Sequence, residues 1–341
     1  MDRAHRGEPV LSGPSTVLAT PILGAPLTRE LVARIEAVDG VRCALIGSDG
    51  HMHGDADESV FDEADVLLLG SVPASVLDHV VSRAPKLRWI HSASAGVDRI
   101  STPIVRQRGL LVTNARGVFS RPIAEYVVMM SLAIARRLPH LLELQRERTW
   151  QPLRGRELSE LTVGIIGYGS IGEEVARLLE PFGCRLLATR RHIDRGVGTA
   201  GRVELFALDD LAEVLSASDI VVVAAPLTDE TAGLIGADQL AEMREDAWLI
   251  NIARGRLIDE LALRRALESG WIGGAVLDVF SEEPLPSDSP LYRTPNLVIT
   301  PHTSWASDRV IERSVDLFVE NLRRDRAGEA LRNVVDLEAG Y

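Results

Sequence analysis

Three glycines in the stretch VGIIGYGSIGEEVA have a spacing that suits a phosphate-bearing ligand, because Gly167, Gly169 and Gly172 form G-x-G-x-x-G. The first permits a tight turn from strand to helix, the second leaves room for a pyrophosphate, and the third lets the helix pack on the strand. The free N–H groups of the helix start, around Ser170 and Ile171, would face the phosphates. Because one strand pattern precedes the turn and another follows its helix, the motif predicts dinucleotide binding.

The next predicted strand ends in Thr189, Arg190 and Arg191, where a dinucleotide site usually carries an acid. An Asp or Glu there hydrogen-bonds the ribose 2′-hydroxyl of NAD, whereas an Arg accommodates the 2′-phosphate of NADP. The Thr189 hydroxyl could donate a hydrogen bond, and the two guanidinium groups could bind the phosphate. We therefore expect NADP(H) to be preferred. NAD(H) is the alternative if the arginines form an ordinary solvated loop, and His192 stays unassigned.

Three later segments carry polar residues directly after predicted strands. Arg254 follows the strand INIA, Asp278 and Glu283 lie in LDVFSEEPLP, and His302 lies in VITPH. The carboxyl ends of parallel strands form the ligand-binding edge of an open α/β sheet, so we expect these side chains at that edge. An arginine suits the binding of an anion, and a histidine suits proton transfer near neutral pH.

These residues need a scaffold, and the apolar pattern predicts alternating strands and helices twice along the chain. A long helical pattern over about 122–145 separates the two series. Such alternation predicts helices packed on parallel sheets, and two α/β units suggest a cleft between domains as a ligand site. The predicted strands are 16–20, 42–47, 64–70 and 87–94, then 161–167, 185–189, 219–226, 247–253, 273–280 and 297–300.

Taken together, the motifs make the chain similar to one known family, the D-isomer-specific 2-hydroxyacid dehydrogenases. The resemblance spans nearly the whole chain and includes SAGVD (94–98), VTNARG (112–117), AEYV (124–127), the glycine turn, INIARGRLID, LDVFSEEPLP and TPH. It implies a flavodoxin-like substrate domain, residues 1–121 with 312–341, and a Rossmann NAD(P)-binding domain, residues 122–311. It also implies a homodimer formed through the helical region 122–145.

The family's catalytic Arg, Glu and His fall on Arg254, Glu283 and His302, with Glu282 as the adjacent alternative to Glu283. The substrate class is a small 2-oxo or 2-hydroxy acid. Arg254 would hold the carboxylate and ketone oxygens, and His302 would supply the proton when hydride reaches the carbonyl carbon. Glu283 would orient the imidazole and favour its charged form.

Binding residues follow from the same resemblance. Backbone N–H groups around Ala95 and Gly96 would bind the substrate carboxylate, Asp278 would contact the nicotinamide carboxamide, and Trp305 would either line the substrate pocket or pack at the domain junction. With the turn and the arginines, the expected cofactor-binding set is Gly167, Tyr168, Gly169, Ser170, Ile171, Gly172, Thr189, Arg190, Arg191, Pro226, Thr231, Ile252, Ala253, Arg254 and Asp278.

The composition of this chain of 341 residues argues against several classes of binding partner. Its net charge of −12 argues against nucleic-acid binding. Its apolar runs are too short to span a bilayer, and two cysteines outside any CxxC pair argue against a zinc site. We therefore expect a cytoplasmic protein without metal. The NADP signature resembles that of the glyoxylate and hydroxypyruvate reductases of the family, and this resemblance implies an enzyme that reduces glyoxylate or hydroxypyruvate. The alternatives are an NAD-dependent member acting on another acid, such as a phosphoglycerate-like one, and a corepressor-like protein that senses a dinucleotide.

Overall fold

The computed structural model describes residues 13–52, 57–96, 100–191 and 198–337. The chain divides into two compact domains. Domain 1 comprises residues 1–119 and 307–341, and domain 2 comprises residues 120–306. The boundaries expected from the sequence, after residues 121 and 311, lie within a few residues of these. His192, as well as Val97 and Asp98 of the SAGVD motif, lies outside the described residues.

Domain 1 is built on a five-stranded sheet with the order β2-β1-β3-β4-β5, in which every pairing is parallel. This is the strand order of a flavodoxin-like doubly wound sheet. Most residues of its strands are apolar, because helices cover both faces of the sheet. The strands are β1 (Ser15–Ala19), β2 (Val41–Leu45), β3 (Val66–Leu69), β4 (Trp89–Ser92) and β5 (Leu111–Thr113).

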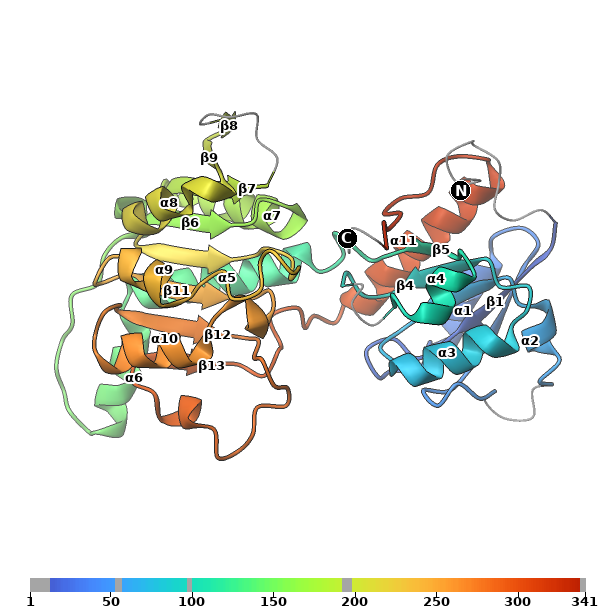
Figure 1. Ribbon diagram of the computed structural model, residues 1–341, viewed down its shortest axis with the longest axis horizontal. Coiled ribbons are helices and arrows are strands. Elements are labelled where there is room, and N and C mark those ends of the chain that lie inside the picture. The colour runs from blue at the N-terminus through green and yellow to red at the C-terminus, as the bar shows by residue number, and fades with distance from the viewer. Residues whose placement is uncertain (1–12, 53–56, 97–99, 192–197, 338–341) are drawn as a thin grey trace. The chain divides into compact units, whose positions relative to one another are not determined.

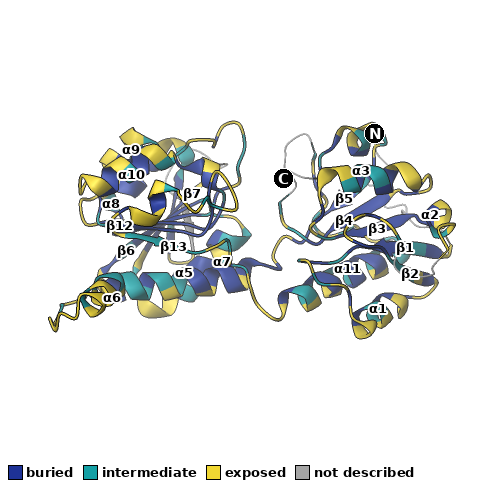
Figure 2. Cartoon of the chain, turned by 90° about the horizontal axis from the view of Figure 1, so that it is seen from below, coloured by how far each residue is buried: buried dark blue, intermediate teal, exposed yellow. Residues whose placement is uncertain are grey.

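The helices of domain 1 form a layer on each face of this sheet (Figures 1 and 2). Helices α1 and α11 pack on one face of the sheet. There Phe318 of α11 lies against Trp89 of β4, with ring centroids 5.6 Å apart. Helices α2, α3 and α4 pack on the opposite face over Leu67 and Ile90. The last helix therefore returns to the domain that contains the first strand. The helices are α1 (Arg29–Glu36), α2 (Val60–Glu63), α3 (Ala74–Arg83), α4 (Pro103–Gln107) and α11 (Val310–Arg326).

Domain 2 contains an eight-stranded sheet with the order β13-β12-β11-β10-β6-β7-β9-β8, parallel except for the edge pair β8–β9. Strand β6 lies between β7 and β10, so the strand order reverses there, as at the ligand-binding point of a Rossmann fold. The strands are β6 (Thr162–Ile166), β7 (Arg185–Arg190), β8 (Gly198–Ala200), β9 (Val203–Ala207), β10 (Ile220–Val223), β11 (Trp248–Asn251), β12 (Gly274–Leu277) and β13 (Leu297–Ile299).

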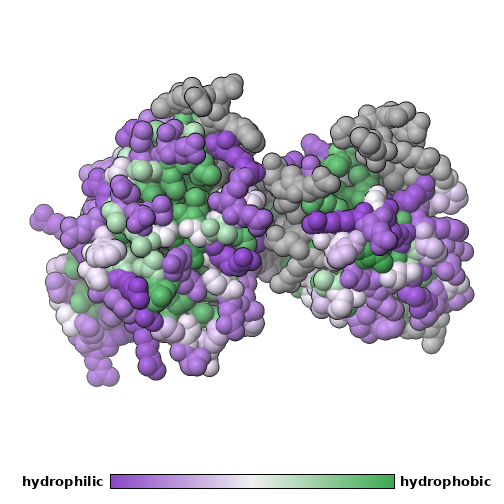
Figure 3. Space-filling view, viewed as in Figure 1, coloured by the Kyte–Doolittle hydropathy of each residue, from purple (hydrophilic) through white to green (hydrophobic). Residues whose placement is uncertain are grey.

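Helices α5 and α7 lie on one face of this sheet, and α8, α9 and α10 cover the other (Figure 2). On the face of domain 2 seen in Figure 3, hydrophilic residues frame a central group of apolar ones. None of the helices in the described residues is long and apolar enough to cross a membrane. The helices are α5 (Ser120–Ala135), α6 (Leu138–Arg146), α7 (Ser170–Leu179), α8 (Leu211–Ala217), α9 (Ala237–Glu242) and α10 (Glu260–Glu268), with short 3₁₀ turns at Leu158–Glu160, Glu180–Phe182, Leu208–Asp210, Gly255–Leu257 and Pro290–Arg293.

The single helix expected over about 122–145 is in fact two helices. Helix α5 ends at Ala135 and α6 begins at Leu138, with Arg137 between them in the left-handed region at φ +57°. Pro139 in the first turn of α6 explains the break, because a proline ring clashes with the carbonyl four residues back and offers no N–H to it.

The apolar pattern also misses β5, β8 and β9. Strands β5 and β8 have only three residues each, too few for a recognisable alternation. In β9 the apolar run is interrupted by Glu204, which forms an ion pair with Arg185 of β7 at 2.9 Å. The charged Glu204 therefore pairs with a residue of the neighbouring strand and does not mark a loop.

Candidate active site

The glycine turn after β6 has the geometry of a phosphate cradle. Gly167 has φ +100°, and a Cβ placed there would lie 2.6 Å from the Ala225 Cα. A Cβ at Gly172 would lie 2.4 Å from the Gly167 carbonyl oxygen, so these two glycines permit close backbone packing. Gly169 meets no atom within 4 Å, which leaves open space in front of the first turn of α7. The residues present therefore fit a dinucleotide pyrophosphate at this helix start, including Ser170.

Thr189 has a different role from the one expected. Its side chain is only 1 % exposed, and its hydroxyl oxygen accepts a hydrogen bond from the Gly167 N–H at 3.1 Å. Its carbonyl oxygen accepts from the Tyr168 N–H at 2.8 Å. A buried hydroxyl engaged with the turn is not directed at a 2′-phosphate. Thr189 instead ties the end of β7 to the glycine turn, whereas Arg190 and Arg191 directly after it are exposed.

The predicted cofactor residues after β10 and β11 lie at the same edge of the sheet. Pro226 is exposed, and its carbonyl oxygen accepts a 2.7 Å hydrogen bond from the buried Thr231 hydroxyl. That hydroxyl also accepts from the Thr228 N–H at 2.8 Å, so Thr231 acts as a brace for the loop. Ile252 and Ala253 are buried just beyond β11 and lead into Arg254.

The loop that carries Arg254 is held by its own strand and by a neighbouring loop. The Asn251 side chain donates to the Arg254 carbonyl oxygen at 3.0 Å, and its Oδ1 accepts from the Ala253 N–H at 3.1 Å. A Cβ at Gly255 would lie 1.9 Å from the Phe280 carbonyl carbon, so only glycine permits this approach. Gly255 thus brings the Arg254 loop against the loop after β12. The sequence motif ARG contained this glycine, but its spacing alone did not reveal the contact.

His302 and Glu283 form a hydrogen-bonded pair. The His302 Nδ1 lies 2.7 Å from the Glu283 Oε2, and the other carboxylate oxygen accepts from the Phe280 N–H at 2.9 Å. Both oxygens of Glu283 are therefore engaged, and with Nδ1 as the donor to the carboxylate, Nε2 is the imidazole nitrogen left for a substrate. The partner of His302 is Glu283 and not the adjacent Glu282.

Asp278 holds the His302 loop, and the nicotinamide contact expected of it stays a prediction. Its side chain is fully buried, and its Oδ1 accepts from the Thr303 N–H at 2.9 Å and from the Thr300 hydroxyl at 2.6 Å. Its Oδ2 accepts from the Ser304 N–H at 2.9 Å. Three donors of this loop thus occupy most of the acceptor sites of the buried carboxylate, so Asp278 positions the loop that carries His302.

Tyr126 of α5 extends this network. Its hydroxyl lies 2.7 Å from the Thr300 Oγ1. Because Thr300 has one hydroxyl hydrogen and Asp278 accepts it, Tyr126 is the donor in this contact. Burial raises the pKa of Tyr126 to about 12, which keeps that proton in place. Sequence reasoning missed Tyr126 and Thr300, although both lie within or next to the motifs AEYV and TPH.

In domain 1, Ala95 and Gly96 follow β4, and the orientation of their peptides is set by two carbonyl contacts. The Ser94 carbonyl accepts from the Ala115 N–H at 3.0 Å, and the Ala95 carbonyl accepts from the Asn114 side chain at 2.8 Å. In a planar trans peptide the N–H points opposite to the preceding carbonyl. The N–H groups of Ala95 and Gly96 are therefore directed away from the contacts that hold this loop.

Trp305, the other residue expected near the substrate, is half-buried and lies three residues after His302.

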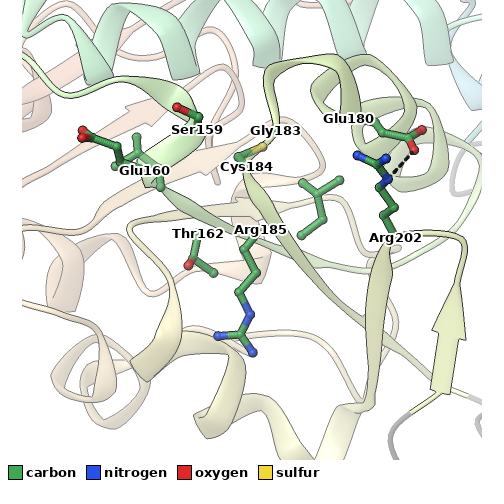
Figure 4. A pocket seen from close by; sticks show the side chains of 10 residues that line it. Ser159, Glu160, Thr162, Glu180, Gly183, Cys184, Arg185 and Arg202 are labelled. Carbon is green, nitrogen blue, oxygen red and sulfur yellow. Dashed lines mark ion pairs between the residues drawn. The ribbon is translucent and has the colours of Figure 1, made fainter.

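A hollow of about 350 Å³ lies at the amino-terminal edge of the sheet of domain 2, near the starts of β6 and β7 (Figure 4). An ion pair of 3.5 Å between Arg202 and Glu180 borders it. Because parallel strands place the glycine turn at the opposite edge, this hollow is separate from the dinucleotide cradle. The described residues contain no cluster of side chains suited to a metal ion.

Arg254, Glu283 and His302 follow β11, β12 and β13, which are neighbours in the sheet. A bound nicotinamide would supply or accept a hydride. Beside it, a guanidinium can orient an anionic substrate, and the His302 Nε2 can give or take a proton at the substrate oxygen. Glu283 orients the ring for that transfer, and the Asp278 network keeps the loop in place.

Comparison with known proteins assigns this arrangement to a family. Residues 128–304 match the model of the D-isomer specific 2-hydroxyacid dehydrogenase, NAD binding domain. A glyoxylate reductase from Korarchaeum cryptofilum is 37 % identical over 269 residues, which cover 76 % of this chain and 79 % of that protein.

Solved structures show the same relationship over both domains. A D-isomer specific 2-hydroxyacid dehydrogenase from Xanthobacter autotrophicus Py2, in complex with NADPH and MES, is 32 % identical, covers 97 % of this chain and 100 % of its own, and has a TM-score of 0.83. An NADPH-dependent glyoxylate/hydroxypyruvate reductase from Sinorhizobium meliloti, in complex with NADP and sulfate, is 27 % identical, covers 96 % and 100 %, and has a TM-score of 0.80. The chain thus belongs to the D-isomer specific 2-hydroxyacid dehydrogenases and is an NAD(P)-dependent oxidoreductase of that family.

Proposed function

We propose that the protein is an NADP-preferring reductase of small 2-oxo acids, with glyoxylate or hydroxypyruvate as the leading substrates. The observation that carries the proposal is the end of β7, where the exposed Arg190 and Arg191 stand in place of an acid. Thr189 binds this strand end to the Gly167 turn, so the arginines follow directly on the cradle. A guanidinium favours a ribose phosphate and an acid would repel it.

The names of similar proteins support both the proposed cofactor and the proposed substrates. The Xanthobacter and Sinorhizobium structures hold NADPH and NADP, and the latter is a glyoxylate/hydroxypyruvate reductase. The Korarchaeum protein is a glyoxylate reductase. In this chain we assign the orientation of the substrate to Arg254 and the proton to the His302 Nε2. The outward N–H groups of Ala95 and Gly96 are a further element suited to a carboxylate.

The deciding experiment is a steady-state assay of the full chain against a panel of 2-oxo acids with NADPH and with NADH. We expect the highest kcat/KM for glyoxylate or hydroxypyruvate with NADPH. Turnover mainly with NADH, or mainly of a phosphorylated acid such as phosphohydroxypyruvate, would favour the phosphoglycerate-like alternative. If NADPH binds and no acid of the panel is turned over, the corepressor-like alternative is favoured.

We also propose that the protein is a homodimer through α5 and α6. Among the residues of α6 none is buried, although three of its leucines, Leu138, Leu141 and Leu142, are large apolar side chains with about two fifths of their surface exposed. Met129 of α5 and Trp150 beyond α6 are also exposed. A projecting helix with so many exposed apolar side chains is typical of a protein–protein interface, and a second copy brings an equivalent apolar helix to it.

A further inference from the structure

Arg191 forms an ion pair with Glu230, and this pair joins two distant segments of domain 2. Arg191 follows β7 directly, whereas Glu230 lies in the loop after β10. The sheet order β10-β6-β7 places β6 between these two strands. Two strand spacings amount to roughly 10 Å, which an arginine and a glutamate can span together. The pair therefore reaches across the carboxyl end of β6, the strand that leads into the glycine turn.

The loop that carries Glu230 is ordered by its own hydrogen bonds. The next residue, Thr231, is buried and braces this loop, because its hydroxyl donates to the Pro226 carbonyl at 2.7 Å and accepts from the Thr228 N–H at 2.8 Å. Glu230 itself is 68 % exposed, and Arg191 is 39 % exposed. The carboxylate is thus presented to Arg191 from a braced turn at the cofactor edge of the sheet.

An exposed ion pair of this kind contributes little to the free energy of unfolding, typically well under about 1 kcal/mol. A contribution to folding stability therefore does not explain why Arg191 and Glu230 are paired. A phosphate monoester carries a charge of about −1.5 to −2 and three acceptor oxygens, so it is a stronger partner for a guanidinium than a single carboxylate. Glu230 holds the same guanidinium that the proposed function assigns to the 2′-phosphate.

We propose that Glu230 is a specificity-determining residue that competes with the cofactor's 2′-phosphate for Arg191 and thereby limits the affinity for NADP(H). The inference rests on the proposed function in one respect, the assignment of Arg191 to the phosphate. Because Glu230 would act at the 2′ position alone, it lowers the NADP(H) to NAD(H) affinity ratio and leaves NAD(H) binding nearly unchanged. Glu230 would thus offset part of the preference that Arg190 and Arg191 create.

Equilibrium binding to the substrate-free protein tests the competition without any turnover. Titrations of wild type and Glu230→Gln with NADPH, NADH and adenosine 2′,5′-bisphosphate report on the phosphate separately from the nicotinamide. At a separation of 5–7 Å in water, a carboxylate and a phosphate dianion repel by about 1 kcal/mol, so we expect about three- to tenfold tighter NADPH and bisphosphate binding. NADH binding should change by less than about twofold by the same charge argument, since it lacks the phosphate.

The matched control is Glu204→Gln, which removes the exposed partner of Arg185 at the other end of β7. It changes the net charge by the same amount and should leave all three affinities as in wild type. In an Arg191→Gln background, Glu230→Gln should tighten NADPH binding less than it does in the wild-type background, because the competition for Arg191 is gone and only direct repulsion between the carboxylate and the phosphate remains.

The outcomes separate this inference from the proposed function. Weaker NADPH binding by Glu230→Gln would overturn it, because Glu230 would then position Arg191 for the phosphate. Unchanged affinities, or an equal gain for NADH, would overturn it as well. If Glu230→Gln has no effect while Arg190→Asp lowers NADPH affinity, only the inference fails. If Arg190→Asp leaves the affinity ratio unchanged, it is the proposed cofactor preference that fails.

Discussion

Asp278 and His302 are joined through the backbone, since the His302 N–H donates to the Asp278 carbonyl oxygen at 2.8 Å. His302 has φ +49°, a left-handed conformation that costs about 1–3 kcal/mol for a residue other than glycine. Such a conformation persists only where the surroundings hold it. The Asp278 carboxylate supplies that restraint by binding the next two N–H groups, those of Thr303 and Ser304.

Replacement Asp278→Asn should therefore lower kcat more than it changes the KM for the cofactor. An amide keeps one acceptor but places an NH₂ group against a buried donor, which costs about 1–3 kcal/mol and loosens the His302 loop. We expect kcat to fall at least about tenfold, since a small misplacement of a catalytic group can reduce the rate about 10²-fold. Steady-state kinetics measures the fall in kcat, and thermal unfolding measures the loss of stability.

The control for Asp278→Asn is Tyr126→Phe, which removes only the outermost hydrogen bond of the same network. It should cost about 1 kcal/mol of stability and leave kcat within a few fold. A large rise in the cofactor KM for Asp278→Asn, with kcat unchanged, would instead favour the nicotinamide contact expected from the sequence.

The acid–base pair makes a second prediction. His302→Ala removes the proton donor and should lower kcat by a factor of about 10²–10⁴. Glu283→Gln keeps a hydrogen-bond acceptor for Nδ1 but removes the charge, so we expect a smaller loss, on the order of tenfold. Single-turnover rates with bound NADPH would measure both, and Glu282→Gln is the matched control with near-normal rates. A His302→Ala enzyme with a normal rate would exclude His302 from proton transfer.

Local motifs account for what the sequence could predict about this site. The glycine turn, Arg254 and His302 each lie in a short segment whose residue types are characteristic and whose place after a strand follows from the alternation of elements. The pairing of Glu283 with His302 was an expectation from the family pattern, and the structure brings the two side chains together at 2.7 Å.

Roles that depend on packing between distant segments could not be predicted. In the sequence Gly255 resembles an ordinary turn glycine. Only the fold shows that the Phe280 backbone, in the loop after β12, lies too close to it for any side chain. Thr189 has a polar side chain at a strand end, and only its 1 % exposure shows that the hydroxyl faces the protein and not a cofactor. Tyr126 lies in a helix far along the chain from Thr300, so their contact requires the folded domain.

Cofactor choice gives a third prediction. Arg190→Asp introduces the acid that NAD-binding sites carry at the end of this strand and should repel a 2′-phosphate. We expect the kcat/KM ratio of NADPH to NADH to fall at least about tenfold, which corresponds to about 1.4 kcal/mol. Initial rates at several cofactor concentrations measure the ratio, with Arg185→Asp at the start of β7 as the control. An unchanged ratio would make Arg190 an ordinary solvated residue.

The dimer proposal predicts a response to charge on α6. Leu142→Asp places a carboxylate among exposed leucines and should reduce the mass in solution from two chains to one, measured by size-exclusion chromatography with light scattering. Leu261→Asp is the control, because Leu261 is a similarly exposed leucine on α10. A monomeric wild type, or a dimeric Leu142→Asp protein, would contradict an interface at α6.

Acid sensitivity of domain 1 is the last prediction. His91 on β4 is fully buried, with Nδ1 2.7 Å from the Thr113 hydroxyl oxygen and its ring 5.3 Å from that of Phe318. Burial lowers the pKa of His91 to about 3, from an ordinary value of 6.5. Between these pH values the unfolded chain binds a proton that the folded chain does not. The contribution of the neutral His91 to the free energy of unfolding is therefore fully present above about pH 6.5. Below that pH it falls by about 1.4 kcal/mol per pH unit.

Urea unfolding of wild type and His91→Leu between pH 5 and pH 7.5 measures this contribution. The variant should show a shallower loss of unfolding free energy below pH 6.5, because its apolar side chain takes up no proton in either state. His51→Gln is the control, since His51 is exposed in the same domain and its replacement should leave the slope unchanged. Equal slopes for wild type and His91→Leu would show that His91 is protonated in the folded domain, or that other groups dominate its acid response.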